Sequence, residues 1–287
     1  MDRIKVLVTG ADGQLGREIR DIANDYPKFL FIFFNRQALP IEQPNAVNAA
    51  FMKYRPAFCV NCAAYTAVDK AENDQLAAYS INATAVGILA ENCREFSTRF
   101  VHISTDYVFD GNADHPLTEE DPTGPINIYG SSKLLGESLA LNANVNTIIL
   151  RSSWVYSAYG NNFVKTMIRL MGEREAIQVI EDQVGSPTYA ADLAAAIIKI
   201  ISSSVFKSGI YHYSNKGAIS WFEFAMAIKE IIKSPCQVIS IAGTQYPTAA
   251  KRPRYSNMDK SKIQRDYQVQ ILPWRKRLEA CIHKIEQ

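Results

Sequence analysis

Short apolar segments alternate with helical patterns through the first half of the chain, and this alternation restricts the fold more than any other feature. Five segments have the composition of buried strands: Ile4–Thr9, Phe29–Phe34, Phe58–Cys62, Phe100–Ser104 and Thr147–Arg151. Helical patterns lie between them, near Leu15–Asn24, Asn45–Lys53, Asp74–Phe96 and Ile128–Leu141. Strands that are apolar on both faces and are joined by helices indicate a parallel sheet with helices on both sides. The predicted fold class is therefore α/β, with a doubly wound parallel sheet.

After residue 151 the alternation becomes less regular. Helices are predicted at Asn162–Met171, Tyr189–Ser202 and Trp221–Lys233, with Ser220 as the N-cap of the last, and Gly209–Tyr213 has the pattern of a strand. We predict that residues 1–150 form one domain, which also takes later sheet elements from about 176–215. Residues 151–287 are predicted to form mainly a smaller C-terminal α/β domain that is interleaved with the first.

Charge and composition exclude several classes of function. The 31 basic and 29 acidic residues give a formal net charge of +2 and form no long blocks, so the sequence favours neither nucleic-acid nor membrane binding. The run Phe29–Phe34 is far shorter than the ~20 residues of a membrane helix, and the N-terminus lacks the apolar region of a secretion signal. We expect a cytoplasmic protein that acts on a small molecule.

Five cysteines, an odd number, fit a reducing compartment better than a disulfide framework. Cys59 and Cys62 have the spacing of a metal or redox pair. However, no second cysteine or histidine pair follows at ligand spacing, and residues three apart on a strand point to opposite faces. We interpret both as small buried residues of a central strand.

A glycine-rich turn follows the first predicted strand. The segment Thr9–Gly16 places three glycines between the strand Ile4–Val8 and a helix. One glycine lets such a turn close, one lets the backbone approach a pyrophosphate, and one lets the helix pack on the strand, while free N–H groups of the helix bind the anion. A merely tight turn is the alternative. A Rossmann-type dinucleotide site is favoured, with Gly10, Gly13, Gln14, Leu15 and Gly16 as cofactor-binding residues.

The end of the second predicted strand bears on the choice of cofactor. An acidic residue that binds the ribose is expected about 20 residues after the glycine turn, and the chain has Asn35 and Arg36 there instead. A guanidinium can pair with a 2′-phosphate. We therefore predict Asn35 and Arg36 as cofactor-binding residues and NADPH as the preferred cofactor. A solvated surface arginine is the alternative, which leaves NADH open.

Tyr129 and Lys133 lie four residues apart on a predicted helix and share one face. An ammonium beside a phenol stabilises the phenolate and lowers the tyrosine pKa from its reference near ~10, which makes the hydroxyl a usable proton donor. An accidental surface pair is the alternative. Upstream, an apolar strand ends in Ser104 and Thr105, where either hydroxyl could hydrogen-bond a substrate carbonyl while a nicotinamide supplies hydride.

Taken together, these motifs resemble the short-chain dehydrogenase/reductase superfamily, in its extended branch that acts on nucleotide sugars, and more narrowly the dTDP-4-dehydrorhamnose reductase family. The resemblance covers nearly the full length, and several motifs in the same order are far more specific than any one. The matching segments are Thr9–Gly16, Asn61–Glu72, Ser104–Gly111, Tyr129–Glu137, Arg151–Tyr156, Gly160–Phe163, Asp182–Thr188 and Arg252–Pro253.

The resemblance implies roles for individual residues. The implied catalytic residues are Thr105, Tyr129 and Lys133. Thr105 is favoured over Ser104, and the tyrosine is the acid. Tyr129 and Lys133 are also implied as cofactor-binding residues, the lysine by holding the nicotinamide ribose. The implied cofactor-lining residues are Ala63, Ala64 and Tyr65. The residues implied for the nucleotide-sugar substrate are Thr105, Asp106, Tyr129, Trp154, Asn162 and Arg252, the last as a fork for the diphosphate. A core tryptophan and a solvated basic loop are the alternatives for Trp154 and Arg252.

A departure from the family pattern concerns metal binding and assembly. Some members bind magnesium through glutamates at a dimer contact. Glu18 matches one such position, whereas Ala191 stands where another is expected. We therefore predict no bound metal and not that particular dimer, and a homodimer of another kind is left open.

The leading hypothesis is reduction of the 4-keto group of dTDP-4-dehydro-L-rhamnose to dTDP-L-rhamnose with NADPH or NADH. One alternative keeps the fold and the triad but acts as another nucleotide-sugar reductase or epimerase. An alternative of another class is a non-catalytic regulatory subunit of the methionine adenosyltransferase type. Because such a subunit has no need of a hydroxyl, a tyrosine and a lysine together, and this chain has all three, an enzyme is favoured.

Overall fold

The computed structural model describes residues 3–287. Its central sheet has six parallel strands in the order β10–β5–β4–β3–β1–β2. The chain leaves β1 toward β2 and then crosses to β3 on the other side of β1, so the direction of winding changes between β1 and β3. Sheets of this kind bind ligands at that position. The strands are β1 (Ile4–Thr9), β2 (Phe29–Phe34), β3 (Phe58–Asn61), β4 (Arg99–Thr105), β5 (Thr147–Ser152) and β10 (Gly209–Tyr213).

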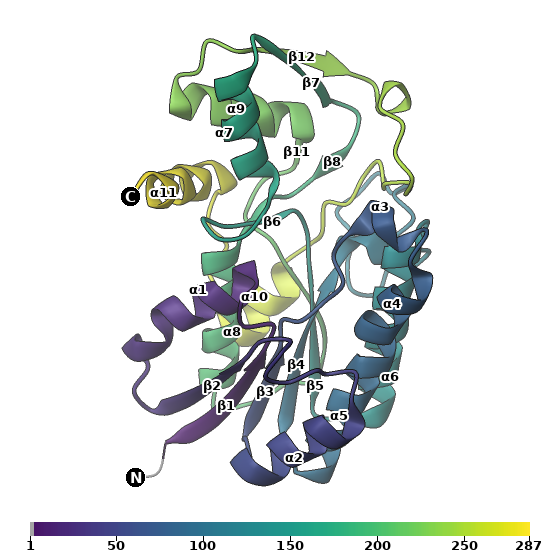
Figure 1. The fold of residues 1–287 in the computed structure, drawn as a ribbon, viewed down its shortest axis with the longest axis vertical. Helices are drawn as coiled ribbons and strands as arrows, with labels where there is room; N and C mark the ends of the chain where they lie inside the picture. Colours follow the sequence, from purple (N-terminus) through teal and green to yellow (C-terminus); the bar gives the residue numbers. More distant parts are fainter. Residues whose placement is uncertain (1–2) are drawn as a thin grey trace.

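Helices cover both faces of the sheet (Figure 1). Val6 and Val8 of β1 point to one face and Leu7 to the other, and each face has its own buried cluster. The first face carries α1 (Gln14–Ile22), α8 (Ala190–Ser202) and α10 (Ser261–Tyr267). The second face carries α2 (Pro44–Tyr54), α5 (Ala85–Glu95) and α6 (Ile128–Ala143). The prediction of an α/β fold with a doubly wound parallel sheet is thereby confirmed.

The two cysteines near β3 lie on different faces of the sheet. Cys59 is fully buried on the face that carries α2 and α5, whereas Cys62 is half-buried and packs against the opposite face. The prediction that they point apart is confirmed, although β3 ends at Asn61 and Cys62 follows the strand. Burial also raises the pKa of the Cys62 thiol, so this group is not a ready nucleophile.

The C-terminal part of the chain builds a second hydrophobic core of its own (Figure 1). The helices α7 (Phe163–Glu173) and α9 (Trp221–Ile232) pack on the parallel pair β7 (Ala176–Ile180) and β12 (Gln237–Ile241), beside α11 (Trp274–Glu286). The short elements are β6 (Val155–Tyr156), β8 (Val184–Gly185), β9 (Thr188–Tyr189), β11 (Ile219–Ser220) and the 3₁₀ turns Ala23–Asp25, Asp106–Val108 and Gly243–Gln245. Within residues 3–287, no helix has both the length and the apolar character needed to cross a membrane.

The start of α9 confirms a cap that the sequence predicts. The Ser220 hydroxyl accepts a hydrogen bond from the backbone N–H of Glu223 at 3.1 Å. In return the Glu223 carboxylate accepts one from the backbone N–H of Ser220 at 2.7 Å. This reciprocal pair satisfies two backbone donors that a helix start would otherwise leave free, and so sets where α9 begins.

The predicted helix Asp74–Phe96 contains an irregularity that the apolar pattern does not predict. It consists of α4 (Gln75–Tyr79), a π-helical turn over Ser80–Thr84, and α5; a single turn, α3 (Val68–Ala71), precedes it. The π turn carries Asn82, whose side chain accepts a hydrogen bond from the backbone N–H of Tyr65 at 2.8 Å and donates one to the Tyr65 carbonyl at 3.0 Å. The irregular turn therefore holds the segment that leaves β3.

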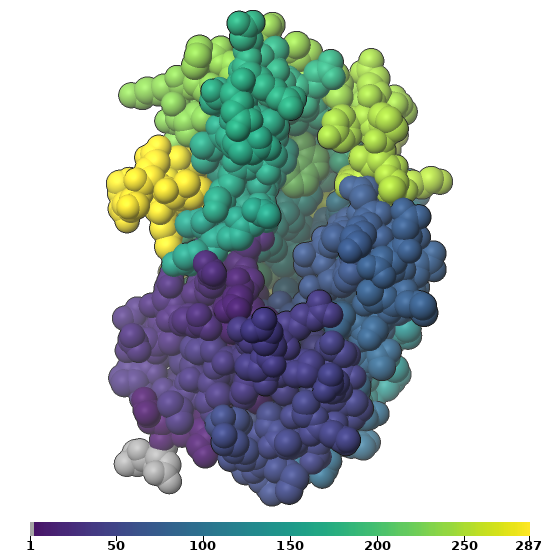
Figure 2. Space-filling model, viewed as in Figure 1, coloured from purple at the N-terminus to yellow at the C-terminus, as the bar shows by residue number. Residues whose placement is uncertain are grey.

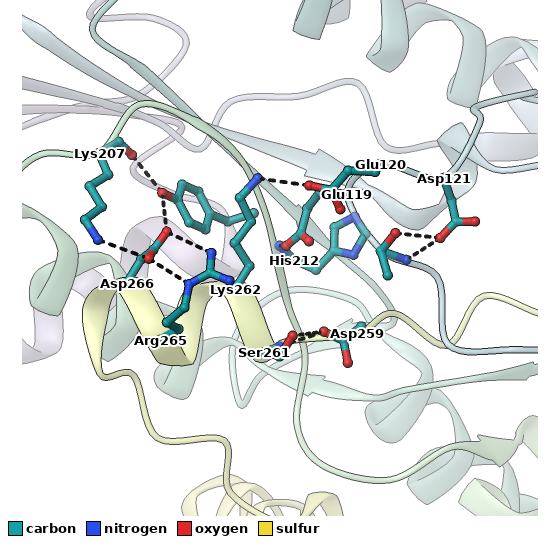
Figure 3. Close-up of polar contacts among 12 residues, drawn as sticks. Glu119, Glu120, Asp121, Lys207, His212, Asp259, Ser261, Lys262, Arg265 and Asp266 are labelled. Carbon is teal, nitrogen blue, oxygen red and sulfur yellow. Dashed lines mark hydrogen bonds and ion pairs between the residues drawn. The ribbon is translucent and has the colours of Figure 1, made fainter.

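The edge strand β10 is attached to α10 by a cluster of polar side chains (Figure 3). Asp266 of α10 accepts hydrogen bonds from Nζ of Lys207 at 3.1 Å and from the hydroxyl of Tyr211 at 3.2 Å. Nearby, the Glu119 carboxylate accepts one from the backbone N–H of His212 at 2.9 Å. These contacts cover polar groups at an edge of the sheet, where unpaired strand groups can otherwise pair with other chains.

Replacing Asp266 with alanine is expected to lower the free energy of unfolding by about 1–3 kcal/mol, because Lys207 and Tyr211 lose their common acceptor. The hydrogen bond from Arg265 is the largest cause that lowers the pKa of Asp266 to about 2, from a reference of 3.8. Because the carboxyl pKa is lowered on folding, the ionised Asp266 contributes its full share to the free energy of unfolding above pH 3.8. This contribution is lost as the pH falls toward 2.

Urea unfolding at neutral pH and in acid checks this prediction. The difference between the natural protein and the Asp266→Ala variant should shrink as the pH falls through the range between the two pKa values. Asp114→Ala is the matched control, since that carboxylate is fully exposed. A loss of stability that is the same at both pH values would contradict the ionic role.

Candidate active site

The glycine turn between β1 and α1 allows two close backbone approaches. Gly10 has a φ of +65°, and a Cβ atom there would lie 2.5 Å from the backbone nitrogen of Ala63. A side chain at Gly16 would collide with the carbonyl oxygen of Gly10. Glycine is needed at both positions because the turn packs directly against the end of β3 and α1 packs against the turn. The backbone N–H groups at the start of α1 are thereby brought to the carboxyl edge of the sheet.

A cavity of about 320 Å³ opens where β1, β2 and β3 end, at the change in winding direction. Of the residues predicted to bind the cofactor, Gln14, Leu15, Gly16, Tyr129 and Lys133 do not line it. The Gln14 amide donates to the Val155 carbonyl at 3.5 Å, and Leu15 is buried in the core beside the sheet. The predicted residues that do line the cavity are Gly10, Gly13, Asn35, Arg36, Ala63, Ala64 and Tyr65.

The end of β2 carries an amide and a guanidinium. Asn35 donates to the Asp12 carboxylate at 2.9 Å and accepts a hydrogen bond from the backbone N–H of Ala38 at 2.9 Å. The Arg36 side chain is 83% exposed, and its guanidinium lies 3.9 Å from the Glu42 carboxylate. A pair this exposed holds an arginine weakly. Arg36 is therefore accessible to an anion at the rim of the cavity.

β4 ends in two hydroxyl residues with different partners. The Ser104 hydroxyl donates to the buried carboxylate of Glu137 on α6. The Thr105 hydroxyl donates to the Asp106 carboxylate at 3.1 Å, and it lies close enough to the Tyr129 phenol to lower the pKa of that group. The hydroxyl beside the tyrosine is therefore that of Thr105 and not that of Ser104.

Tyr129 and Lys133 both point from α6 toward β4, but the lysine contacts groups other than the phenol. Its Nζ atom lies 2.6 Å from the carbonyl oxygen of Ile103 and 3.1 Å from Nε2 of His102. Only 1% of Lys133 is exposed. Burial lowers its pKa to about 8, although the negative charge of Glu137 acts in the opposite direction.

The pKa of Tyr129 moves in the opposite direction to the one expected from the sequence. Burial raises it to about 12, the hydrogen bond with Thr105 lowers it, and the charge of Asp106 raises it. The expectation that Lys133 lowers this pKa is wrong, because the lysine is engaged with His102. A phenol with a pKa this high carries its proton throughout the neutral range, as a proton donor must.

Asp106 is a buried carboxyl group with an incomplete set of partners. It is 2% exposed, and within residues 3–287 its Oδ2 atom has no hydrogen-bond partner. Burial raises its pKa to about 6, although hydrogen bonds from Ser256 and Thr105 lower it. Buried polar atoms nearly always have a partner in folded proteins, so Oδ2 is an exception that keeps the capacity to accept a hydrogen bond.

A larger cavity, of about 710 Å³, lies in the C-terminal part. The elements α7, β7 and β12 supply mostly apolar walls, Trp221 of α9 adds an aromatic ring, and Asp69 and Arg252 supply charges. Figure 2 shows the surface hollowed between α7, in teal, and the blue segments near α3. A concave site with apolar walls and a few polar groups is typical of small-molecule binding.

Residues 4–287 match the model of the family described as RmlD substrate binding domain. A dTDP-4-dehydrorhamnose reductase from Aggregatibacter actinomycetemcomitans is 39% identical, covering 96% of this chain and 97% of the relative. The spore coat polysaccharide biosynthesis protein SpsK of Bacillus subtilis is 40% identical, covering 98% and 97%. A crystal structure of dTDP-4-dehydrorhamnose reductase from Bacillus anthracis in complex with NADP superposes with a TM-score of 0.95 at 39% identity, covering 99% of this chain and 100% of that one. The chain belongs to the dTDP-4-dehydrorhamnose reductase family.

Among the substrate residues that this reductase family implies, Trp154 lies beneath the larger cavity rather than on its wall. Its ring stacks on that of Trp221, with ring centroids 3.5 Å apart and an interplanar angle of 8°. Its backbone has a φ of +48°, which is uncommon for a residue with a large side chain. Trp154 therefore supports Trp221, which lines the cavity. A direct contact between Trp154 and a substrate stays a prediction.

Asn162 uses its side chain inside the protein. Its Oδ1 atom accepts a hydrogen bond from the backbone N–H of Lys165 at 3.1 Å and so caps α7. Its Nδ2 atom donates to Oε1 of Gln14 at 3.0 Å and to the carbonyl of Ser157 at 2.7 Å. The amide therefore joins α1 to α7, and its contact with a substrate of the reductase family stays a prediction.

Arg252 lines the larger cavity, but its guanidinium already has an anionic partner. Two of its nitrogens donate to the Asp69 carboxylate, at 3.1 Å and 2.6 Å. The ion pair lowers the pKa of Asp69. The Arg252 side chain is 20% exposed and is thus held in place at the rim of the cavity. Its contact with a diphosphate stays a prediction.

Glu18, which the sequence resemblance matches to a magnesium position, forms its contacts within the chain. Its carboxylate accepts hydrogen bonds from the Ser157 hydroxyl at 2.5 Å and from Nζ of Lys284, on α11, at 2.8 Å. Ala191, which replaces the second glutamate, offers no ligand atom. In the part of the chain that the structure describes, no cluster of three or more His, Cys, Asp or Glu side chains could hold a metal ion. The absence of a metal and of that dimer stay predictions.

Several residues at the site carry little signal in the sequence. Trp221 follows the predicted N-cap Ser220 but lies outside every matching motif, so only its position in the fold reveals it. Asp69 lies within the motif Asn61–Glu72, yet its pairing with Arg252 joins positions that are remote in the sequence. His102 occupies an apolar strand and shows its contact with Lys133 only when β4 and α6 are packed together.

Proposed function

We propose that the chain reduces the 4-keto group of dTDP-4-dehydro-L-rhamnose to dTDP-L-rhamnose, with NADPH as the hydride donor. One observation carries the proposal: the Tyr129 phenol lies beside Thr105 at the end of β4, and Lys133 of the same helix reaches β4 at Ile103, on the same edge of the sheet as the glycine-lined cavity. Two comparisons support it, since a 39% identical relative is named for this substrate and a similar structure is in complex with NADP.

The smaller cavity fits a dinucleotide. The missing side chain at Gly10 lets the turn pack against the end of β3, and the start of α1 offers N–H groups to a pyrophosphate. Ala63, Ala64 and Tyr65 would form the wall, and Arg36 would pair with a 2′-phosphate. Gln14 and Leu15 would act only by holding α1 in place. When bound, NADPH supplies the hydride that reaches the carbonyl carbon of the sugar.

Tyr129 would supply the proton. Its phenol carries a proton at neutral pH, and the Thr105 hydroxyl beside it can orient the carbonyl oxygen. The proton moves from Oη of Tyr129 to that oxygen, which becomes the new hydroxyl, and the ammonium of Lys133 stabilises the phenolate that is left. The free Oδ2 atom of Asp106 would accept a hydrogen bond from a sugar hydroxyl.

The two parts of the chain would divide the ligands between them. We assign the dinucleotide to residues 1–150 together with β10, and most of the substrate to residues 151–287. Trp221, supported by Trp154, offers a flat surface for a nucleotide base. Arg252 offers its guanidinium to the diphosphate at the rim nearest the reaction site.

An anaerobic assay with NADPH and dTDP-4-dehydro-L-rhamnose tests this function. We expect one NADPH to be oxidised for each dTDP-L-rhamnose formed, measured by nicotinamide absorbance and by chromatography of the sugar nucleotide. Turnover without net oxidation of NADPH would identify an epimerase instead. No turnover with this or any other nucleotide-linked 4-keto-sugar would leave only a binding role for the protein.

Replacing Arg36 with alanine is expected to lower kcat/KM for NADPH by about 10-fold to 100-fold, because a charge-assisted contact with the 2′-phosphate is lost. The value for NADH, which lacks that phosphate, should stay within about twofold. Steady-state kinetics with both cofactors measures the ratio. Arg20→Ala is the control, since this arginine packs on Phe33 outside the cavity. Equal losses with both cofactors would rule out 2′-phosphate recognition by Arg36.

A further inference from the structure

A chain of buried polar side chains lies behind Lys133. Nζ of Lys133 is 3.1 Å from Nε2 of His102, and Nδ1 of His102 is 3.0 Å from Nδ2 of Asn61. His102 and Asn61 are fully buried, and neither was assigned a role in cofactor or substrate binding. The three residues come from α6, β4 and β3, so the contact forms only when these elements pack together.

The backbone sets the direction of the hydrogen bonds in this chain. The N–H of Ala63 lies 3.1 Å from Oδ1 of Asn61, and the Thr9 hydroxyl donates to the same atom at 2.5 Å. A backbone N–H can only donate, so the atom that faces Ala63 is the amide oxygen. The NH₂ group of Asn61 must then face His102. Nδ1 of His102 is therefore a hydrogen-bond acceptor and carries no proton.

The remaining nitrogen of His102 then faces Lys133 with its proton. A neutral imidazole has one N–H, and burial lowers the pKa of His102 well below its usual value. The proton is therefore on Nε2 and points at Nζ of Lys133. An ammonium has no lone pair to accept it, whereas a neutral amine accepts from Nε2–H and still donates to the carbonyl of Ile103.

We propose that Asn61 and His102 are positioning residues that favour the uncharged amine of Lys133 in the ligand-free protein. The inference rests on the proposed function, in which Lys133 acts as an ammonium beside the Tyr129 phenol. Lys133 must then leave His102 and bind one proton from water when the ligands assemble. No other bond changes in this step, because His102 keeps its single proton.

The charged groups around Lys133 are consistent with this assignment. On α6, Glu137 favours the ammonium, but its carboxylate is shared with Arg151 of β5 and Ser104 of β4. Asp106 at the end of β4 titrates with a pKa raised by burial to about 6, and it contacts Thr105 rather than the lysine. Of the two groups that contact Nζ, the Ile103 carbonyl only accepts hydrogen bonds, whereas His102 carries a proton. His102 therefore determines whether Lys133 is an amine or an ammonium.

The tautomer of His102 tests the proposal without any ligand. Nitrogen-15 NMR of histidine-labelled protein should show His102 neutral, with the proton on Nε2, across the range from about pH 6 to pH 9. The exposed His115 should titrate in the same spectra and serves as the internal control. A proton on Nδ1, or a charged His102 in this range, would overturn the proposal.

Two variants sharpen the NMR test. Asn61→Asp replaces the NH₂ group by an acceptor, so His102 should move its proton to Nδ1 and turn a lone pair toward Lys133. His102→Gln removes the imidazole, so the NMR signals that disappear in this variant are those of His102. Because Asp and Asn have nearly the same shape, Asn61→Asp keeps the proposal testable even where His102→Gln fails to fold. A His102 tautomer that does not change in Asn61→Asp would overturn the assignment.

Proton uptake on NADPH binding tests the consequence for Lys133. Calorimetry in buffers of different ionisation enthalpy, at about pH 9, should show close to one proton bound per site. Asn61→Asp and His102→Gln should cut this uptake severalfold, because an acceptor beside Nζ leaves Lys133 charged before binding. His115→Gln should behave like the natural protein. Equal uptake in all variants would overturn the proposal.

The two ideas can fail separately. If the natural protein did not oxidise NADPH with any keto-sugar, the proposed function would be refuted. The His102 tautomer would still test whether Asn61 and His102 favour the uncharged amine of Lys133. Conversely, full activity in a protein whose His102 carries its proton on Nδ1 would refute the role proposed for Asn61 and His102. The proposed reductase function would stand.

Discussion

Tyr129→Phe should reduce kcat for keto-sugar reduction by about 10²-fold to 10⁴-fold, the range over which a positioned acid contributes to proton transfer. The variant removes the phenol proton that the proposed mechanism transfers to the carbonyl oxygen, while the ring and its packing stay. NADPH affinity should change by less than about twofold, because the phenol contributes little to the glycine-lined cavity. Single-turnover kinetics and fluorescence titration with NADPH measure the two effects.

Tyr107→Phe is the matched control for this experiment. Tyr107 packs edge-on against Tyr129, with ring centroids 5.7 Å apart, and its hydroxyl contacts Arg252 rather than Thr105. Its loss should therefore affect KM for the sugar nucleotide more than kcat. If Tyr107→Phe and Tyr129→Phe lowered kcat equally, the proton donor would have to be sought elsewhere.

Glu137→Leu is expected to lower the free energy of unfolding by about 3–5 kcal/mol, the cost of leaving a buried charge without its partner. The Glu137 carboxylate and the Arg151 guanidinium are each 2% exposed, and two nitrogens of Arg151 donate to it at 3.0 Å and 2.7 Å. Ser104 donates to the same carboxylate. Urea unfolding measures the loss.

A double variant separates the loss of the pair from the loss of either charge. In Glu137→Leu/Arg151→Met both charges are gone, so most of the lost stability should return. The same comparison also bears on the position of Lys133. Glu137 lies one turn beyond Lys133 on α6, and its hydrogen bond with Ser104 holds this helix against β4. If Glu137→Leu alone lowered the free energy of unfolding by less than about 1 kcal/mol, water would have to reach the Arg151 guanidinium.

The elements of the sheet could be predicted from the sequence because their signals are local. Buried parallel strands are continuous apolar runs, and the predicted bounds of Ile4–Thr9, Phe29–Phe34 and Gly209–Tyr213 agree with β1, β2 and β10. The glycine turn could also be predicted, since a backbone that must approach another strand closely requires glycine whatever lies around it.

The parts of the site that depend on contacts between remote segments could not be predicted. A helix pattern brings Tyr129 and Lys133 to one face, but it does not show that β4 buries both of them. That burial is why the Tyr129 pKa rises instead of falling. Likewise, nothing in the sequence pairs Trp154 with Trp221, because only the packing of the C-terminal core stacks the two rings.

The anchoring of α1 has a mechanical consequence for ligand entry. This helix starts at the glycine turn, yet its side chains are joined to the C-terminal part at several points, among them Gln14 with Asn162 and Glu18 with Lys284. Across the larger cavity the corresponding connection is the ion pair of Asp69 with Arg252, which is partly exposed to solvent. A widening of this cavity that separated Asp69 from Arg252 would leave the contacts of α1 in place and would free the guanidinium for an anion.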